Sequence, residues 1–487
     1  MDEILASLGM EIDAAADRED VIALHYLIDK CKENLTAGPE GNDSLIYFFE
    51  ANCHSVLASL REDKTVWSWN QADKLSEVLC LRRAVSGVGF ASLNKVFKAK
   101  IYTNLGNVLN SLGRFIEAIR YWDSALSEIP NFAMALGNKG IGLFNYAQSL
   151  YDYGHGGVLI AGAEKNLTKA LSRKALWESG ADANARLAFS HYKKASNRIL
   201  KGIEYNQNFS LDGYSLGRSR DEKLYRKWAL HNKLFLSPLN DLHQLSISSR
   251  DTIHLPSHRY SLDEKPRFPN YFNLLKQEYI SARYSLFEAV HGKAKHFSDN
   301  EALLMNGYDG VYFGYRTEQI KIAYRLGYST LDKVALFINE YFSVGLNPSQ
   351  VSFKRLWGEE KKGAFALREI FIDRENWPLR GLYFLSRDLF DTEFVATALP
   401  EAEKLSDIRN KAEHRFLSLQ EFAFGVESTE IHTYITVDEF TRRTLKVLSM
   451  ARESLIYLSL AMHREEQRRR SLKGDDGMVM EIPSSPL

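Results

Sequence analysis

Residues suited to metal-free chemistry on a phosphate lie together in one short run, RNKAEHR at positions 409–415. Histidine suits proton transfer because its pKa lies near neutral pH, which makes His414 the candidate for that role. Arginine suits a phosphate because its planar fork donates two hydrogen bonds and stays charged while negative charge builds up, which makes Arg409 the candidate phosphate ligand. RNA can be cleaved without a metal ion when its 2′-OH loses a proton and attacks the adjacent phosphate. The run therefore has the residue types for that reaction.

The spacing within this run decides which side chains can meet. On a helix, Asn410 and His414 share a face because they are four positions apart, whereas Arg409 points about 100° away from Asn410. A site that uses all three needs a groove, and a dimer in which two such helices face each other would provide one. The alternative is a solvated helix, because Asp407 and Lys411 form an ordinary i,i+4 charge pair.

Spacing alone does not single out this pair. Chance predicts roughly 2.6 arginine–histidine pairs with four to six residues between them in a chain of this composition, and the sequence contains four. Two of the others lie among repeat-like helical segments, where scattered surface charge is the ordinary explanation, and the third lies just before a linker: Arg18/His25, Arg186/His191 and Arg226/His231. Only Arg409/His414 lies late in an aromatic helical region, with one more long helical segment after it.

The N-terminal half of the chain has helical periodicity almost throughout, from about residue 12 to 235. In residues 101–130, two apolar helical patterns are separated by Leu112–Arg114, and the second ends at Pro130. Small residues permit close approach of the two helices and large ones fill the space between them: Gly106 and Ala118 against Leu105, Leu109 and Trp122. The spacing resembles a tetratricopeptide (TPR) repeat of about 34 residues. One repeat cannot bury its own apolar face, so helical neighbours are expected.

Weaker patterns surround this repeat. A degenerate second repeat is expected from Ala133, and residues 20–35 and 43–61 predict another helical pair upstream. The glycine-rich run GHGGVLIAG at 154–162 lacks a Gly-Lys-Ser/Thr signature and a preceding strand pattern, so a nucleotide site is not expected. We expect a loop between repeat helices there.

An aperiodic stretch at 236–270 contains four of the 11 prolines and predicts a linker. His254 and His258 lie within it at a metal-like spacing, but Pro256 opposes the helix that would align them, so no metal site is expected there. Helical periodicity then resumes in strongly aromatic segments that predict a bundle of four to six helices: 271–292, 317–346 with a break near Gly327, 377–391, 401–422 and 438–470.

Composition excludes several classes of protein. The chain of 487 residues is 45% hydrophobic and 25% charged, which is typical of a soluble globular protein. Its 62 basic and 62 acidic residues cancel, so any contact with RNA must be local. The cysteines, Cys31, Cys53 and Cys80, fit neither a disulfide framework nor a zinc pattern. The acidic N-terminus is unlike a signal peptide and no apolar run is long enough to span a membrane, so we expect a cytoplasmic location and no membrane contact. We also expect no cofactor, because neither a nucleotide site nor a metal site is expected from the sequence.

Three features together resemble a bacterial family that joins N-terminal repeats to a C-terminal HEPN domain: the repeats, the run WALHNKLFLSPLNDL at 228–242 and the late RNKAEH. The resemblance implies an all-α fold, with TPR-like helices at 1–235, a linker at 236–270 and a HEPN-like bundle at 271–465. Residues 466–487 would form a basic helix end and a disordered tail.

The HEPN resemblance also implies a function, that of a metal-independent endoribonuclease. Arg409 would hold the phosphate and His414 would transfer protons. Asn410 would orient either the phosphate or His414. Lys411 and Arg415 would bind RNA. The resemblance further implies a homodimer through the C-terminal bundle, a protein or peptide regulator on the repeats, and a role in phage defence or in a toxin system. The alternative is a non-enzymatic repeat scaffold whose HEPN bundle only dimerises or binds RNA.

The last predicted helix ends in a basic cluster, Arg468–Arg470. These side chains are candidates for contact with RNA phosphates. A solvated helix end explains them equally well, because positive charge is favoured at a helix C-terminus.

Overall fold

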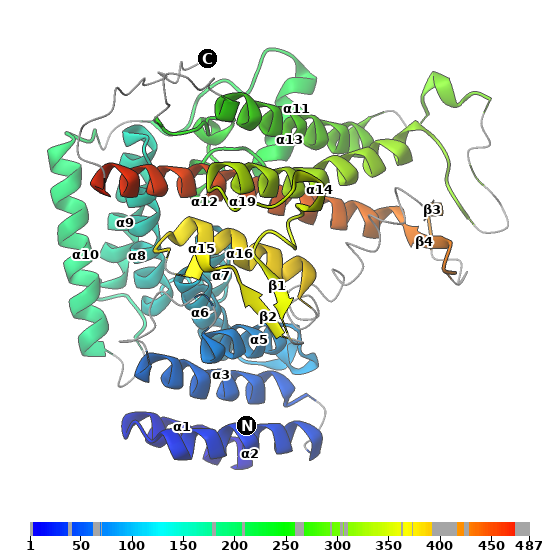
Figure 1. The fold of residues 1–487 in the computed structure, drawn as a ribbon. Helices are drawn as coiled ribbons and strands as arrows, with labels where there is room; N and C mark the ends of the chain where they lie inside the picture. Colours follow the sequence, from blue (N-terminus) through cyan, green and yellow to red (C-terminus); the bar gives the residue numbers. More distant parts are fainter. Residues whose placement is uncertain are drawn as a thin grey trace. The chain divides into compact units, whose positions relative to one another are not determined.

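The computed structural model describes residues 3–37, 41–61, 69, 71–177, 182–206, 210–258, 267–292, 295–301, 305, 310–361, 364–372, 374–391, 416–422 and 428–472. Helices dominate these residues, and their only strands form two small sheets of two strands each, which confirms the predicted all-α class. The chain folds as two compact units (Figure 1). The N-terminal unit comprises Met1–Asn206 and Glu369–Phe384, and the C-terminal unit comprises Gln207–Arg368 and Leu385–Leu487. Within the described residues, none of the helices combines the length and the apolar character needed to cross a bilayer.

The N-terminal unit is a succession of helices: α1 (Glu3–Asp17), α2 (Val21–Ala37), α3 (Asp43–Leu60), α5 (Ala72–Ser86), η1 (Val88–Ser92), α6 (Lys95–Ser111), α7 (Phe115–Glu128), α8 (Ala133–Ser149), α9 (Tyr153–Ala170), α10 (Asp182–Gly202), α15 (Glu369–Ile372) and the first half of α16 (Trp377–Phe390). Neighbours in sequence pack on each other, as α3 does on α5, α6 on α7 and α8 on α9. Helices α2 and α3 confirm the helical pair predicted upstream of the repeat.

Helices α6 and α7 approach each other closely at Gly106. A Cβ atom at this position would lie 2.6 Å from Nε1 of Trp122, so glycine is required. Leu105, Ala118 and Trp122 are buried, and Trp122 Nε1 donates a hydrogen bond to Asn107 Oδ1 at 3.0 Å. The predicted packing of this helix pair is therefore confirmed, while its identity as a TPR repeat stays a prediction.

The prediction of a loop at 154–162 is wrong, because these residues belong to α9. Asp152 caps this helix, since its carboxylate accepts hydrogen bonds from two backbone N–H groups of the first turn. A hydrogen bond and charge contact with His155 lower the pKa of Asp152. A Cβ atom at Gly157 would lie 3.1 Å from Ile203 Cδ1. This glycine therefore lets α9 pack closely against Ile203 and does not mark a loop.

A late segment of the chain completes the N-terminal unit. The ring of Trp377 packs on that of Phe115 with centroids 4.4 Å apart, and its Nε1 donates a hydrogen bond to Asn110 O at 2.7 Å. At the turn between α6 and α7, Gly113 has a φ of +87°, and a Cβ atom there would collide with the carbonyl of Trp377. The segment 377–391, which the sequence assigned to the C-terminal bundle, thus contributes its first half to the N-terminal unit.

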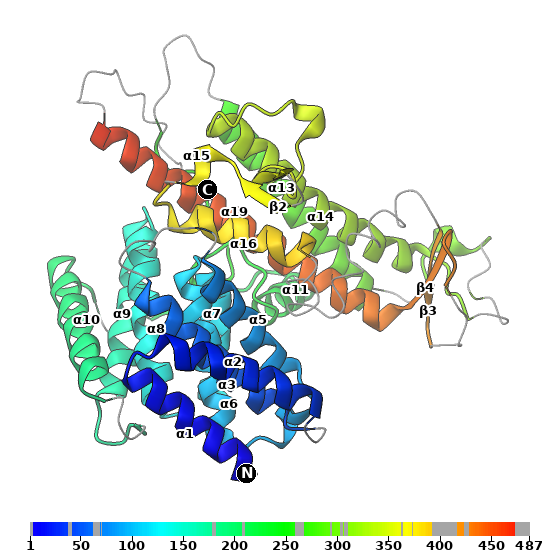
Figure 2. The same ribbon diagram turned by 60° about the horizontal axis from the view of Figure 1, so that its bottom comes forward.

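The C-terminal unit contains long helices, short helical turns and two small sheets: α11 (Arg220–His231), α12 (Leu239–Leu242), η2 (Ser246–Ser248), α13 (Arg267–His291), η3 (Phe297–Asp299), α14 (Tyr315–Tyr341), η4 (Pro348–Gln350), β1 (Gly358–Lys361), β2 (Ala364–Leu367), the second half of α16, β3 (Phe416–Gln420), β4 (His432–Thr436) and α19 (Val437–Leu472). Helix α14 packs on both α13 and α19, and these three helices form the core of the unit (Figure 2). They confirm three of the predicted bundle helices.

Two details of the predicted bundle are wrong. Helix α14 continues through Gly327, where a Cβ atom would lie 3.1 Å from Val447 Cγ1 of α19, so this glycine permits helix packing and does not break the helix. Residues 416–420, expected as helix, form strand β3, which pairs in parallel with β4. Leu417 and Leu419 are buried, and this two-residue period suits a strand.

Candidate functional site

The residues predicted to form the catalytic and RNA-binding site lie outside the described part of the chain: Arg409, Asn410, Lys411, His414 and Arg415. Their placement and roles therefore stay predictions. The described chain stops at Asp391 and resumes at Phe416, the first residue of β3. Strand β3 is thus the first described element after the predicted site in the sequence.

A second histidine, His432, lies on β4 as the register partner of Phe416. Its Nε2 lies 2.7 Å from Ser418 Oγ, and its ring stacks on that of Tyr434 with centroids 4.2 Å apart. Phe416 follows His414 by two residues in the sequence. His432 was not predicted as a site residue, because it belongs to no suitably spaced arginine–histidine pair. The strand-like alternation of FLSLQ and HTYIT was the available signal.

The predicted linker forms an ion pair with a buried arginine of α13. Arg283 is 1% exposed and contacts Asp251 with both arms of its guanidinium, Nη1 to Oδ1 at 2.8 Å and Nη2 to Oδ2 at 2.6 Å. The same guanidinium donates hydrogen bonds to Leu234 O and Tyr225 Oη. Burial by itself would raise the pKa of Asp251, but the contact with Arg283 holds this pKa below its usual value.

A second buried arginine, Arg452 of α19, binds the same stretch of chain. Its Nη1 donates a hydrogen bond to Asp241 Oδ1 at 2.6 Å, while Nε and Nη2 donate to the carbonyl oxygens of Phe235 and Ser237. The described part of the predicted linker is therefore packed within the C-terminal unit, and the two compact units divide after Asn206. The proposed domain division at 235 and 270 stays a prediction.

The basic end of α19 is compensated by acidic residues of the same helix. Arg468 donates hydrogen bonds to both carboxylate oxygens of Glu465. Arg469 binds Glu465 and Glu466, donates to Tyr341 O, and lies over the Tyr341 ring at 4.5 Å. These contacts favour the helix-end explanation of this cluster over a phosphate-binding surface.

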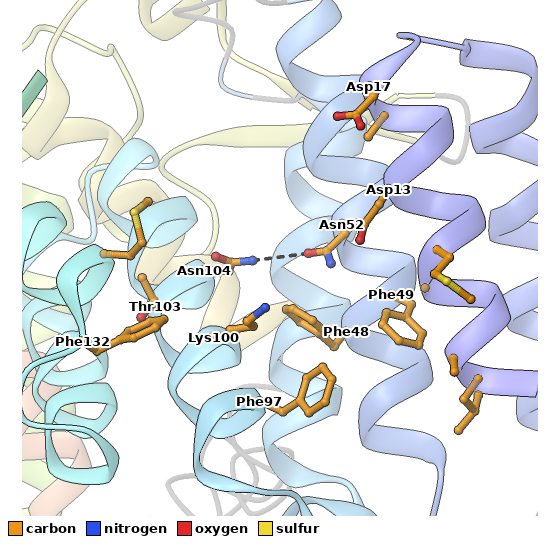
Figure 3. Close-up of a pocket in the computed structure, with 16 residues that line it drawn as sticks. Asp13, Asp17, Phe48, Phe49, Asn52, Phe97, Lys100, Thr103, Asn104 and Phe132 are labelled. Carbon is orange, nitrogen blue, oxygen red and sulfur yellow. Dashed lines mark hydrogen bonds between the residues drawn. The ribbon is translucent and has the colours of Figure 1, made fainter. Parts of the chain in front are cut away.

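The N-terminal unit contains an open groove of about 790 Å³ between α1, α3, α6 and the start of α8 (Figure 3). This volume is in the range of sites that bind small molecules or short peptide segments. Aromatic side chains from α3, from α6 and from the residue before α8, together with two methionines, provide much of its apolar lining: Phe48, Phe49, Phe97, Phe132, Met10 and Met134.

The basic and acidic side chains that line this groove come from different helices. Asn52 of α3 and Asn104 of α6 face each other, with Asn104 Nδ2 donating to Asn52 Oδ1 at 3.3 Å, and Lys100 lies one turn before Asn104 (Figure 3). On α1, Asp13 and Asp17 are exposed at the groove. The two amides can bond to a peptide backbone, and the charged groups can select side chains of opposite charge.

Residues 259–465 match the model of a family described as LA2681-like HEPN. The matched range contains α13, α14, α19 as far as residue 465, and all five predicted site residues. The comparisons with curated proteins and with solved structures returned no match. The family match supports a HEPN-type domain within residues 259–465.

Proposed function

We propose that this protein is a metal-independent endoribonuclease of the HEPN type, with Arg409 and His414 as its catalytic pair. The observation that supports this most is that the run RNKAEH lies inside the range that matches a HEPN family, at 259–465. The other three arginine–histidine pairs lie outside that range. The context of the pair, and not its spacing, thus distinguishes it.

The proposed reaction is a transesterification within the RNA. His414 takes the proton of a 2′-OH, whose oxygen attacks the adjacent phosphorus while the bond to the 5′ oxygen breaks. Arg409 donates hydrogen bonds to the phosphate oxygens as negative charge builds on them. Asn410 orients the phosphate or His414, and Lys411 and Arg415 bind neighbouring phosphates. The products are a 2′,3′-cyclic phosphate and a 5′-OH.

A leaving 5′ oxygen needs a proton, and His432 is the candidate donor in the described part of the C-terminal unit. Its register partner Phe416 is two residues from His414. A homodimer through the C-terminal bundle would supply a second His414 for the same purpose. Loss of cleavage in His432→Ala, with RNA binding retained, would favour the first arrangement.

The purified full-length chain incubated with total RNA tests this proposal. We expect cleavage that persists when EDTA is present and that leaves 2′,3′-cyclic phosphate ends, which resist a phosphatase until acid opens the ring. Light scattering on the same sample should show a dimer at micromolar concentration. RNA binding without cleavage under every condition would favour the non-enzymatic scaffold, and cleavage that EDTA abolishes would overturn the mechanism.

We also propose that the groove of the N-terminal unit binds a regulator, an extended peptide segment with apolar side chains and an acidic group. Phe48 and Phe97 would receive the apolar side chains, and Lys100 would receive the acidic one. Control of a nuclease by such a segment would suit a role in phage defence or in a toxin system.

Selection from a random peptide library tests the groove. We expect enriched peptides to combine aromatic or aliphatic residues with an acidic residue. Lys100→Glu should weaken their binding at least tenfold, whereas Lys95→Glu, on the same helix but outside the groove, should leave it unchanged. Peptides that bind both variants equally would contradict the assignment.

A further inference from the structure

Three side chains of metal-ligating types converge between α3 and α5 in the N-terminal unit. Glu50 and His54 lie one turn apart on α3, and Cys80 comes from α5. One carboxylate oxygen, one ring nitrogen and the Sγ atom all lie within 4.8 Å of one another. Glu50 and Cys80 are buried and His54 is half-buried.

A fourth residue orients the histidine. Asp73 of α5 is 8% exposed, and its Oδ1 lies 3.1 Å from His54 Nδ1. Its other oxygen accepts an ion pair from Arg61 at 3.0 Å. Metal-binding histidines in proteins commonly donate their second ring N–H to a carboxylate, which fixes the tautomer. We assign the proton to Nδ1 on this basis, which leaves the lone pair of Nε2 for a metal ion.

The donor set suits zinc. Zinc binds thiolate, imidazole and carboxylate together, with bond lengths of about 2.0–2.3 Å. Donor atoms around a tetrahedral zinc are therefore about 3.5 Å apart, so a small inward movement of these three side chains would complete the site. A buried carboxylate beside a buried thiol gains from a cation between them, because the cation compensates the charge of both deprotonated groups.

We propose that Glu50, His54 and Cys80 bind one zinc ion that joins α3 to α5, with Asp73 as the positioning residue of His54. The fourth position would hold water. The opposite side of α3 carries Phe48 and Asn52 of the groove, so the ion would fix one wall of that groove.

Metal analysis of the full-length chain tests this site independently of any nuclease activity. After dialysis against micromolar Zn²⁺ and gel filtration, we expect about one zinc ion per chain by mass spectrometry of the element. Replacement of zinc by Co²⁺ should give a near-ultraviolet thiolate-to-cobalt charge-transfer band and the strong visible bands of tetrahedral cobalt. A chain that binds no metal, or that binds cobalt without the charge-transfer band, would overturn the proposal.

Variants identify the ligands. Cys80→Ser should remove the charge-transfer band, and Asp73→Asn should weaken zinc binding by about 10- to 100-fold. The matched control is Cys53→Ser, because Cys53 is equally buried on α3 but lies outside the group of three. Zinc should raise the Tm of the wild type and of Cys53→Ser but not that of Cys80→Ser. Equal zinc affinity in Cys80→Ser and the wild type would contradict the assignment whatever the fold of the variant.

Discussion

The N-terminal and C-terminal units each contain a carboxylate that is largely shielded from solvent, and they shift its pKa in opposite directions. In the N-terminal unit, burial raises the pKa of Glu77 to about 8, and a hydrogen bond from Ser55 only partly opposes this. In the C-terminal unit, the paired arms of Arg283 hold the pKa of Asp251 below its usual value despite burial. A buried acid therefore stays neutral beside a hydroxyl and becomes charged beside an arginine.

The buried arginines of the C-terminal unit bind polar groups of that same unit. Arg283 and Arg452 donate to carbonyls and carboxylates of the same unit, and Arg469 is bound by the acids of its own helix. Groups with such partners organise the fold and are poor candidates for a substrate phosphate. In the N-terminal unit, Lys100 lines an open groove.

The largest expected effect comes from breaking the arginine pair. Asp251→Ala leaves the charge of Arg283 buried without its carboxylate and should lower the free energy of unfolding of the C-terminal unit by about 3–5 kcal/mol. Hydrogen exchange of α13 peptides under increasing urea measures this loss. Glu318→Ala is the control, because it removes an exposed pair with Lys321 that is worth about 0–1 kcal/mol. Equal losses in the two variants would refute the distinction.

An intermediate effect is expected from pH in the N-terminal unit. The folded pKa of Glu77, about 8, lies above its ordinary value of 4.5, so between these values the folded state binds more protons than the unfolded state. Stability should therefore fall as pH rises through this window, by about 1 kcal/mol per pH unit. Glu77→Gln should remove that slope in urea titrations at several pH values. The same slope in wild type and variant would mean that another group titrates.

The smallest effects compare helix packing in the two units. Gly106→Ala places a methyl group 2.6 Å from the rigid Trp122 ring and should cost about 1–3 kcal/mol. At Gly327→Ala the nearest atoms are flexible side chains at 3.1 and 3.2 Å, so we expect less than about 1 kcal/mol. Thermal unfolding of both variants measures the difference. A larger loss at Gly327 would reverse the predicted order.

Periodicity predicted the helices because apolar residues every three to four positions can be recognised in the sequence without knowing which element packs against them. It failed where the tertiary neighbour decides the structure. The glycines of residues 154–162 suggested a loop, but Gly157 lies in a helix against the side chain of Ile203. Residues 416–420 form a strand because they pair with β4. The cluster of Glu50, His54 and Cys80 could not be predicted, because Cys80 is far from the other two in sequence and reaches them only through the packing of α5 on α3.

The most direct test compares two histidines under one RNA cleavage assay with EDTA present. His414→Ala should lower the rate of cleavage by about 10²–10⁴-fold, because it removes the proposed general acid–base. Arg409→Lys should also slow cleavage, because lysine lacks the two-pronged contact with phosphate. His231 belongs to an arginine–histidine pair of the same spacing, and the His231→Ala variant should cleave RNA at the wild-type rate. Full activity in His414→Ala, or its loss in His231→Ala alone, would contradict the proposed site.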